Sequence, residues 1–441
     1  MTGRPRDVFA ERRRRFLDAL GERGAALVAA SPVCTRSSDT LYDYRPNSDL
    51  WYLTGFEEPR AAALFLPGHE EHPFVMFVQP RDRSREIWDG WRLGVEAAPE
   101  RLGCDAAFPI GELAERLPKL LTGRSRLVYG LGWNEDMDRT VIRTLHRIRP
   151  LGRKGKPTPR AIEDPIGILH EMRLVKSMAE IAALRRAAQV SAEGHLEGMR
   201  KTRPGMREYE LQAEIEYVFK TRGALAPAYA TIAGSGPNAC ILHYTENRRR
   251  MEEGDLVLVD AGAEVGYYSG DITRTWPVGG TFTGAQRDVY DLVLRAQMAV
   301  IRSVKPGLGW QELHQTSVRV LTEGLIDLGV LEGPPEKAIE EKTYRKVYMH
   351  GAGHWLGMDV HDVGAYAADG DPGRPLEPGM VFTVEPGLYF HADEDGLPER
   401  YRGIGVRIED DVVVTEDGCD VLSSGVPKEP ERIEEIVGAR A

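Results

Sequence analysis

The sequence predicts an α+β fold in which a smaller α/β domain, residues 1–172, precedes a larger domain with pseudo-twofold symmetry, residues 173–441. Three observations lead to this division. Short apolar runs alternate with helical patterns in the first part of the chain, a Pro-rich segment without apolar periodicity follows, and the remainder contains an internal repeat. The length of 441 residues suits two or three domains, and 42% apolar with 28% charged residues is typical of a folded soluble protein.

The N-terminal domain is expected to combine strands with helices. Apolar residues cluster in short runs bounded by turn residues, which is typical of strands; these runs are 24–30, 50–56, 62–68, 73–80 and 126–132. Helical periodicity is found at 7–21, 111–121 and 134–147. Strands that alternate with helices favour an α/β arrangement.

The domain boundary is predicted from residues 151–165, a segment that is basic, then Pro-rich, and without apolar periodicity. In the next stretch, 169–201, apolar residues such as Ile181 and Leu184 recur at near-helical spacing with charges between them. This pattern predicts one long amphipathic helix that opens the second domain.

The second domain contains two copies of one pattern. Each copy has a Pro-Gly stop, an amphipathic helix and a β-rich segment; the matching stretches are 203–211 with 305–313 and 252–262 with 376–387. The alignment makes Asp260 the counterpart of Glu385. Two copies are too few for a repeat array, so we expect two sheet halves about a pseudo-twofold axis, with both carboxylates near that axis.

Charge and cysteine content exclude several classes of partner and fold. The chain has 57 Lys+Arg against 68 Asp+Glu, a formal net charge of −11, which argues against nucleic acid or an anionic membrane as the main partner. The 4 cysteines form no CxxC pair, so reduced thiols in a cytoplasmic protein are expected. The uncharged stretch 223–245 could span a bilayer by length, but its prolines and glycines predict turns instead.

Two aspartates at strand ends give the first indication of a functional site. Asp260 lies near the end of the apolar run 255–262, and Asp271 begins the run 271–276, so a hairpin would place them opposite each other. Facing aspartates repel unless a cation lies between them. By themselves, the two residues would fit exposed turn positions slightly better than a site.

Further acidic residues lie inside apolar strand patterns. Glu385 interrupts the run 380–390, and Arg407 and Glu409 share one face of the run 405–415 because their spacing is two. A buried carboxylate must be paired, protonated or bound to a metal ion. An ion pair with Arg407 would account for one carboxylate and leave the others unexplained.

Histidines supply the remaining candidate ligand. Residues 350–364 contain His350, His354 and His361 among glycines, which disfavour a helix and predict a loop that presents the rings. His243 is a further candidate, in the uncharged stretch. A single histidine is usually structural, but three within twelve residues favour a functional role.

The donor set of two aspartates, two glutamates and one histidine is rich in oxygen. Such a set suits Mn²⁺, Mg²⁺ or Ca²⁺, and the imidazole extends the choice toward Fe, Co and Zn. Two ions about 3.5–4 Å apart, bridged by carboxylates and a hydroxide, would use all of these ligands, and that arrangement is a hydrolytic site. The sequence has neither a GxSxG nucleophile elbow at 233–238 nor a GxGxxG dinucleotide motif at 351–357.

Several stretches together carry a family resemblance: NSDLWYLTGFEEP (47–59), EMRLVKSMAEIAALRRA (171–187), VDAGAEVGYYSGDITRTWP (259–277), HGAGHWLGMDVHDVG (350–364), TVEPGLY (383–389) and GVRIED (405–410). They resemble the pita-bread metallopeptidases, and most closely the aminopeptidase P (Xaa-Pro aminopeptidase) family. The resemblance covers nearly the whole chain. It implies hydrolysis of the N-terminal Xaa-Pro bond of peptides with proline in second position.

The resemblance implies a dinuclear centre with a bridging hydroxide and two divalent ions, with Mn²⁺ as the expected metal. The ligands it implies are those chosen above on chemical grounds: Asp260, Asp271, His354, Glu385 and Glu409. No ligand is missing from the sequence, which disfavours the non-catalytic relatives of the fold and the creatinase branch, which hydrolyses without metal.

The remaining site residues are assigned roles around this centre. We expect Glu385 to shuttle protons and His243 and His361 to stabilise the tetrahedral oxyanion. His350 and Arg407 are expected to orient the peptide, although His350 would also fit a hydrogen bond that orients a metal ligand.

Aromatic residues complete the expected substrate site. Tyr229 and Tyr389 are expected to line the pocket. Relatives of this kind form homotetramers in which a tryptophan of the N-terminal domain reaches a neighbouring active site; Trp88 matches it, although an aromatic at the rim without substrate contact fits equally. The resemblance thus gives the N-terminal domain a role in oligomerisation and at the rim of the substrate site.

Two other functions are compatible with the same fold. Prolidase, an Xaa-Pro dipeptidase, shares the metal ligands and much of the histidine loop, but residues 45–59 resemble aminopeptidase P more closely. A non-enzymatic binding module is disfavoured because the ligand set is intact.

Overall fold

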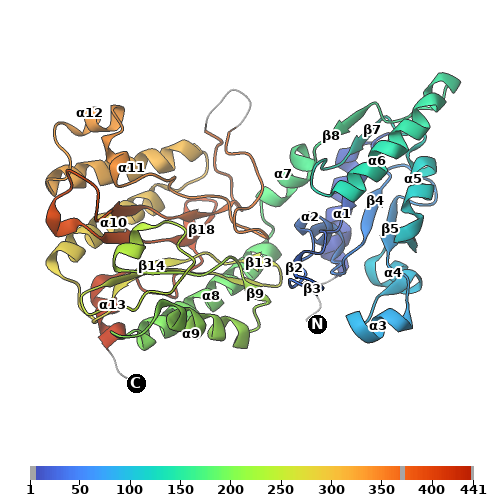
Figure 1. The fold of residues 1–441 in the computed structure, drawn as a ribbon. Coiled ribbons are helices and arrows are strands. Elements are labelled where there is room, and N and C mark those ends of the chain that lie inside the picture. Colours follow the sequence, from blue (N-terminus) through green and yellow to red (C-terminus); the bar gives the residue numbers. More distant parts are fainter. Residues whose placement is uncertain (1–5, 368–372, 439–441) are drawn as a thin grey trace. The chain divides into compact units, whose positions relative to one another are not determined.

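The computed structural model of the chain describes residues 6–367 and 373–438 (Figure 1). The chain divides into two compact units, Met1–Glu171 and Met172–Ala441. Both units combine helices with sheets, which confirms the predicted α+β class with an α/β N-terminal part. Among the described residues, no helix has the length and apolar character needed to cross a bilayer.

The N-terminal unit is built on one mixed sheet with the strand order β6-β5-β4-β1-β7-β8. Strand β4 runs antiparallel to both β1 and β5, whereas the other neighbours are parallel. Its strands are β1 (Ala26–Ala29), β4 (Ala62–Phe65), β5 (Phe74–Val78), β6 (Ala106–Pro109), β7 (Arg126–Val128) and β8 (Ala161–Glu163). A separate ribbon joins β2 (Thr35–Ser37) to β3 (Thr40–Leu41).

Helices pack on both faces of this sheet because side chains alternate along each strand. Leu64 packs in one cluster with Leu117 and Val141, whereas its neighbour Phe65 points the other way and meets Phe16 at a ring distance of 5.2 Å. The helices are α1 (Arg6–Leu20), α2 (Ser48–Thr54), α3 (Arg83–Asp89), α4 (Gly94–Leu102), α5 (Leu113–Leu121) and α6 (Glu135–Ile148).

The strand predicted at 50–56 is wrong, because this segment forms helix α2. The Asn47 side chain accepts a hydrogen bond from the backbone N–H of Leu50 and caps the helix start, and Gly55 ends the helix in the left-handed region with φ 67°. All residues of α2 are buried, so the segment shows no polar face, and a short apolar run does not distinguish a strand from a buried helix.

The second unit repeats one plan twice, as the sequence predicts. In the first half, α8 (Met178–Lys201) and α9 (Glu208–Thr221) accompany the sheet β10 (Ile232–Ser235), β11 (Leu256–Asp260) and β14 (Thr273–Pro277). In the second half, α10 (Gly284–Ser303) and α11 (Trp310–Asp327) accompany β15 (Val381–Val384), β18 (Asp410–Val414) and β19 (Cys419–Val421).

The repeat extends to backbone conformation. Gly205 and Gly307, the stops ahead of α9 and α11, have φ of 87° and 84°. Gly254 and Gly379, ahead of β11 and β15, have φ of 87° and 91°. Residues with a Cβ rarely adopt this region, so the paired glycines are explained by matching turns in the two halves.

Shorter elements complete the second unit. They are α7 (Leu169–Leu174), which crosses the unit boundary, β9 (Ala226–Pro227), β12 (Ala263–Val265), β13 (Tyr268–Ser269), α12 (Pro335–Glu340), β16 (Gly387–Phe390), β17 (Ile404–Arg407) and α13 (Pro430–Gly438). Strand β16 pairs with β17, and β12 pairs with β13 and β9.

The single long helix predicted over 169–201 is wrong, because α7 and α8 are separate helices. Val175 forms a β-bridge to Met380, and Ser177 begins α8 with a capping box whose partner is Glu180. The sequence carries this S-x-x-E signal, which outweighs the apolar periodicity that runs through it.

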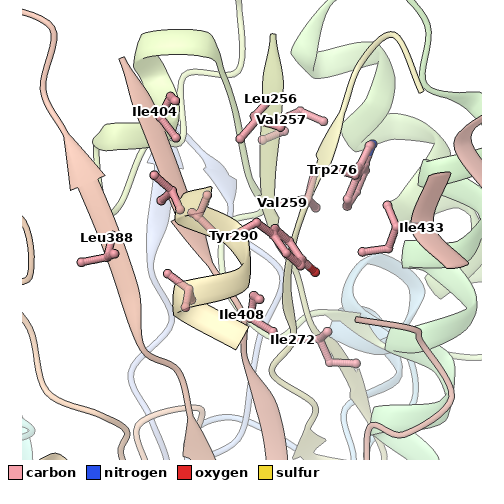
Figure 2. Packing of buried hydrophobic residues seen from close by; sticks show 14 of the residues in the cluster. Leu256, Val257, Val259, Ile272, Trp276, Tyr290, Leu388, Ile404, Ile408 and Ile433 are labelled. Atoms are coloured by element: carbon pink, nitrogen blue, oxygen red, sulfur yellow. The ribbon is translucent and has the colours of Figure 1, made fainter. Parts of the chain in front are cut away.

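The core of the second unit determines which side of β11 is available for a site. Figure 2 shows Val257 and Val259 of β11 in one apolar cluster with Trp276 of β14 and Tyr290 of α10. Because side chains alternate, Asp260 lies on the opposite face of the strand.

Candidate metal centre

The first half of the second unit brings its two aspartates together. Strands β11 and β14 are antiparallel, with Asp260 paired to Thr273, so Asp271 lies just before the partner strand at the same edge. The Tyr229 hydroxyl lies between the two carboxylates, within hydrogen-bond distance of Oδ1 of each. The predicted pairing of the aspartates is therefore observed, with β12 and β13 inserted between the two strands.

The second half contributes two glutamates. Glu385 lies in the link between β15 and β16, and Glu409 lies in the link between β17 and β18, so the single strands predicted over 380–390 and 405–415 are wrong. Glu409 is tied to the first half, because its backbone N–H donates to Thr273 O at 3.0 Å and Thr273 Oγ1 donates to its Oε2 at 2.6 Å. Arg407 faces the same site as Glu409, as expected.

His354 is presented by the glycine-rich loop. Its backbone carbonyl accepts from the N–H of Thr383 at 2.9 Å, and its ring Nδ1 lies 3.0 Å from Trp355 O. A donor Nδ1 leaves Nε2 free to act as a ligand, and this atom lies 3.3 Å from Asp271 Oδ2 and 3.7 Å from Glu385 Oε1. Gly353 is required here because a Cβ at that position would lie 1.9 Å from Thr383 O.

The donor atoms form a cluster that fits metal ions. Ligand atoms of Asp271, His354 and Glu409 lie within 4.8 Å of one another. Asp260 and Glu385 adjoin this cluster through Tyr229 and His354. Carboxylate oxygens with one imidazole suit hard or borderline divalent cations.

The electrostatics of the cluster also favour a cation. Burial raises the pKa of Glu385 to about 7 and that of Glu409 well above its usual range, and the neighbouring carboxylates add to both shifts. Burial likewise raises the pKa of Asp260, although Arg407 opposes the shift. For His354, burial lowers the pKa, but the hydrogen bond to Asp271, the charges of Asp271 and Glu385 and the bond to Trp355 O together outweigh it, giving about 9. Divalent ions between these carboxylates would relieve their burial and their mutual repulsion.

Hydrogen bonds among Arg407, Tyr389 and His350 support the candidate metal centre. Arg407 donates to Asp260 Oδ2 at 2.6 Å, to Thr273 Oγ1 at 3.1 Å and to the Tyr389 hydroxyl at 3.0 Å. His350 Nε2 lies 2.9 Å from the same hydroxyl. Tyr389 is fully buried, so its hydroxyl holds His350 and Arg407 in place. Burial and the charge of Arg407 lower the pKa of His350 to about 3, so the ring is neutral.

Three other expected residues are His361, His243 and Trp88. The rings of His354 and His361 are 4.3 Å apart, and burial, followed by the charge of His354, lowers the pKa of His361. The charge of His243 acts in the same direction on His361 and on His350. Trp88 belongs to α3 of the N-terminal unit, where 85% of its surface is exposed.

The structure adds two residues that sequence reasoning missed. Thr273 bonds both Glu409 and Arg407, and Asp411 accepts the Asp271 backbone N–H with both carboxylate oxygens at 3.2 Å. Asp411 had a signal, since it is an acidic residue inside an apolar strand. Nothing in the local pattern of Thr273 distinguishes it from an ordinary strand threonine.

Comparison with known proteins assigns the family. Residues 182–416 match the model of metallopeptidase family M24, and residues 9–129 match the aminopeptidase P N-terminal domain. The chain is 47% identical to the Xaa-Pro aminopeptidase of Escherichia coli, over 98% of each chain.

Solved structures agree with the sequence matches. Aminopeptidase PepP of Pseudomonas aeruginosa superposes with a TM-score of 0.97 at 46% identity, covering 100% of this chain and 99% of that one. A zinc-substituted E. coli aminopeptidase P in complex with product gives 0.96 at 46% identity, covering 100% of both chains. The chain therefore belongs to metallopeptidase family M24 and, within it, to the aminopeptidase P family.

Proposed function

We propose that this protein is an Xaa-Pro aminopeptidase, which hydrolyses the bond between the N-terminal residue and a proline in second position. The observation that carries the proposal is the intact donor set, assembled from both halves of a unit of the metallopeptidase fold. The relatives that match over nearly the whole chain are named for the same reaction.

The proposed centre holds two divalent ions, for which Mn²⁺ is our first candidate. The proposed ligands are Asp260, Asp271, His354, Glu385 and Glu409. When bound, the ions supply Lewis acidity and lower the pKa of water enough for hydrolysis at neutral pH.

The protein side chains would then manage protons and charge. Glu385 would take a proton from the attacking water on its carboxylate and return it to the departing proline nitrogen. His243 and His361 would donate to the oxygen of the scissile carbonyl as negative charge develops there. Both residues are exposed, so a peptide could reach both rings.

Another group of residues would hold the peptide. His350 and Arg407 are both hydrogen-bonded to the Tyr389 hydroxyl. The neutral imidazole and the guanidinium would therefore meet the residue after the scissile bond as fixed polar groups. Tyr229 would line the other side while it positions the two aspartates.

The test of this function is peptide hydrolysis with metal restored after chelation. We expect Xaa-Pro-Yaa tripeptides to be cleaved to Xaa and Pro-Yaa once Mn²⁺ is added to the chelated protein, with no cleavage before. Asp260→Ala and Glu409→Ala should abolish turnover, whereas Asp291→Ala, on the exposed surface of α10, should keep it. Normal turnover in both site variants would contradict the assignment.

Prolidase activity is the alternative that the same assay decides. Rapid cleavage of Xaa-Pro dipeptides without turnover of tripeptides would reverse the assignment. The match of residues 9–129 to the aminopeptidase P N-terminal domain supports our order.

We further propose a cytoplasmic homotetramer in which the N-terminal domain mediates assembly and contributes to the rim of a neighbouring substrate site. The exposed apolar residues Ile87, Trp88 and Trp91 around α3 support an interface there. Light scattering should give four times the chain mass. Trp88→Ala should raise KM while leaving the metal content unchanged; an unchanged KM would leave Trp88 a rim residue.

A further inference from the structure

Three charged side chains are buried behind the histidine loop. The side chains of Arg173, Lys176 and Asp362 are 3%, 1% and 1% exposed. Arg173 Nη2 lies 2.6 Å from Asp362 Oδ1, and Lys176 Nζ lies 3.1 Å from Asp362 Oδ2. Arg173 also reaches Asp359 at 2.8 Å. Two cations thus hold the two acidic residues of one loop.

The loop is anchored differently at its two ends. The His354 end is held by the second sheet, because Thr383 N–H donates to His354 O at 2.9 Å and Leu356 N–H donates to Val381 O at 3.0 Å. His361, at the other end, directly precedes Asp362, whose backbone N–H donates to Trp355 O at 2.9 Å.

The Asp362 carboxylate also fills the inside of the loop. A Cβ built on Gly357 would lie 2.0 Å from Asp362 Oδ2, so the glycine leaves the space that the carboxylate occupies. The Asp362 carboxylate therefore pairs with the two cations and also occupies the space beside Gly357. In this way it fixes the course of the chain after His361.

Burial of three charges is costly, and apolar groups of similar volume often stabilise a fold as well or better. We infer that Arg173 and Lys176 are positioning residues for His361: by pinning Asp362, they fix the imidazole over the reaction centre. The inference rests on the proposed function, in which His361 acts on the scissile carbonyl. It predicts an effect on His361 and little effect on His354, whose anchor is the sheet.

The test is a double-mutant cycle of Lys176→Met with His361→Ala, read as kcat for an Xaa-Pro-Yaa peptide in the metal-loaded protein. Lys176→Met keeps the apolar stem and leaves Asp362 paired with Arg173. Since a misplacement of about 1 Å can reduce a rate by about 100-fold, we expect a 10- to 100-fold loss of kcat in Lys176→Met. In the His361→Ala background the same change should have no further effect on kcat.

The matched control is Lys428→Met, which removes a mostly buried lysine from Asp410, paired at 2.6 Å, in the same unit. Its effect on kcat should multiply with that of His361→Ala. Metal content and the metal-induced rise in Tm should be unchanged in Lys176→Met, because Thr383 and Val381 anchor the His354 end of the loop directly to the second sheet.

The outcomes separate the inference from the proposed function. Full kcat in Lys176→Met, effects that multiply in the cycle, or loss of bound metal in Lys176→Met would each overturn the inference. Full kcat in His361→Ala would instead overturn the role proposed for His361. If Lys176→Met does not fold, Gly357→Ala, which displaces the Asp362 carboxylate, takes its place in the same cycle.

Discussion

The burial of Glu385 leads to a prediction about how the stability of the metal-free protein depends on pH. Its carboxyl has a pKa of about 7, raised from 4.5 chiefly by burial, so the folded chain holds this proton more tightly than the unfolded chain does. Between those two values folding takes up a proton, and stability therefore falls as the pH rises through that window. From pH 5 to pH 8 the loss amounts to about 2.5 kcal/mol, from 1.36 kcal/mol per pKa unit.

The perturbation is Glu385→Gln, which keeps the size of the side chain and removes the ionisation. We expect urea unfolding of the chelated proteins to show wild-type stability falling by about 2.5 kcal/mol more than that of the variant between pH 5 and pH 8. At pH 8 the metal-free variant should therefore gain stability relative to the wild type.

Added Mn²⁺ should reverse this order at pH 8. A ligand at 100 times its Kd stabilises the folded state by about 2.7 kcal/mol, and the variant has lost one charged ligand, so its gain should be smaller. Parallel pH profiles for the two chelated proteins would refute the electrostatic reasoning. Equal gains on addition of Mn²⁺ would refute Glu385 as a ligand.

Three further changes test the surroundings of the centre. Tyr229→Phe should weaken metal affinity by about 10–100-fold in equilibrium dialysis, because the two aspartates lose the hydroxyl that orients them; unchanged affinity would exclude that role. Gly353→Ala should lower the free energy of unfolding by about 1–3 kcal/mol, since its Cβ clashes with Thr383 O; an unaltered urea midpoint would contradict this geometry. Burial lowers the pKa of His195, whose Nε2 lies 3.0 Å from Ala261 O, from 6.5 to about 4. Stability is then lost as the pH falls from the His195 pKa of the unfolded chain toward that of the folded chain. The loss is about 2.4 kcal/mol between pH 7 and pH 4.5. The His195→Gln variant should not show that loss of stability in acid unfolding curves. Identical curves for the variant and the wild type would contradict this prediction.

Periodicity and turn chemistry were sufficient for most of the fold. The duplicated plan of the second unit was readable because Gly254 and Gly379 recur ahead of equivalent strands, and both require the positive φ that the structure shows. Local signals failed where two of them competed. The apolar run at 50–56 fits a strand or a buried helix, and the periodicity over 169–201 masked the cap at Ser177.

The sequence by itself determined the chemistry of the candidate centre. Glu385 and Glu409 interrupt apolar patterns in the sequence, and a buried carboxylate must be neutralised, which singled out both residues as candidate ligands. Only the tertiary structure decided how these groups are held. Thr273 bridges Glu409 and Arg407 across the two halves, and such a contact has no local signature because it joins segments more than a hundred residues apart.

The buried ion-pair cluster behind the histidine loop depends on tertiary structure in the same way. Arg173, Lys176 and Asp362 each read as an ordinary surface charge in sequence, since charged residues are usually exposed. Folding buries them together, and burial converts weak surface charges into strong and specific partners. The sequence thus determined which groups are available for hydrolysis, whereas their positions were decided by long-range packing, which local pattern does not encode.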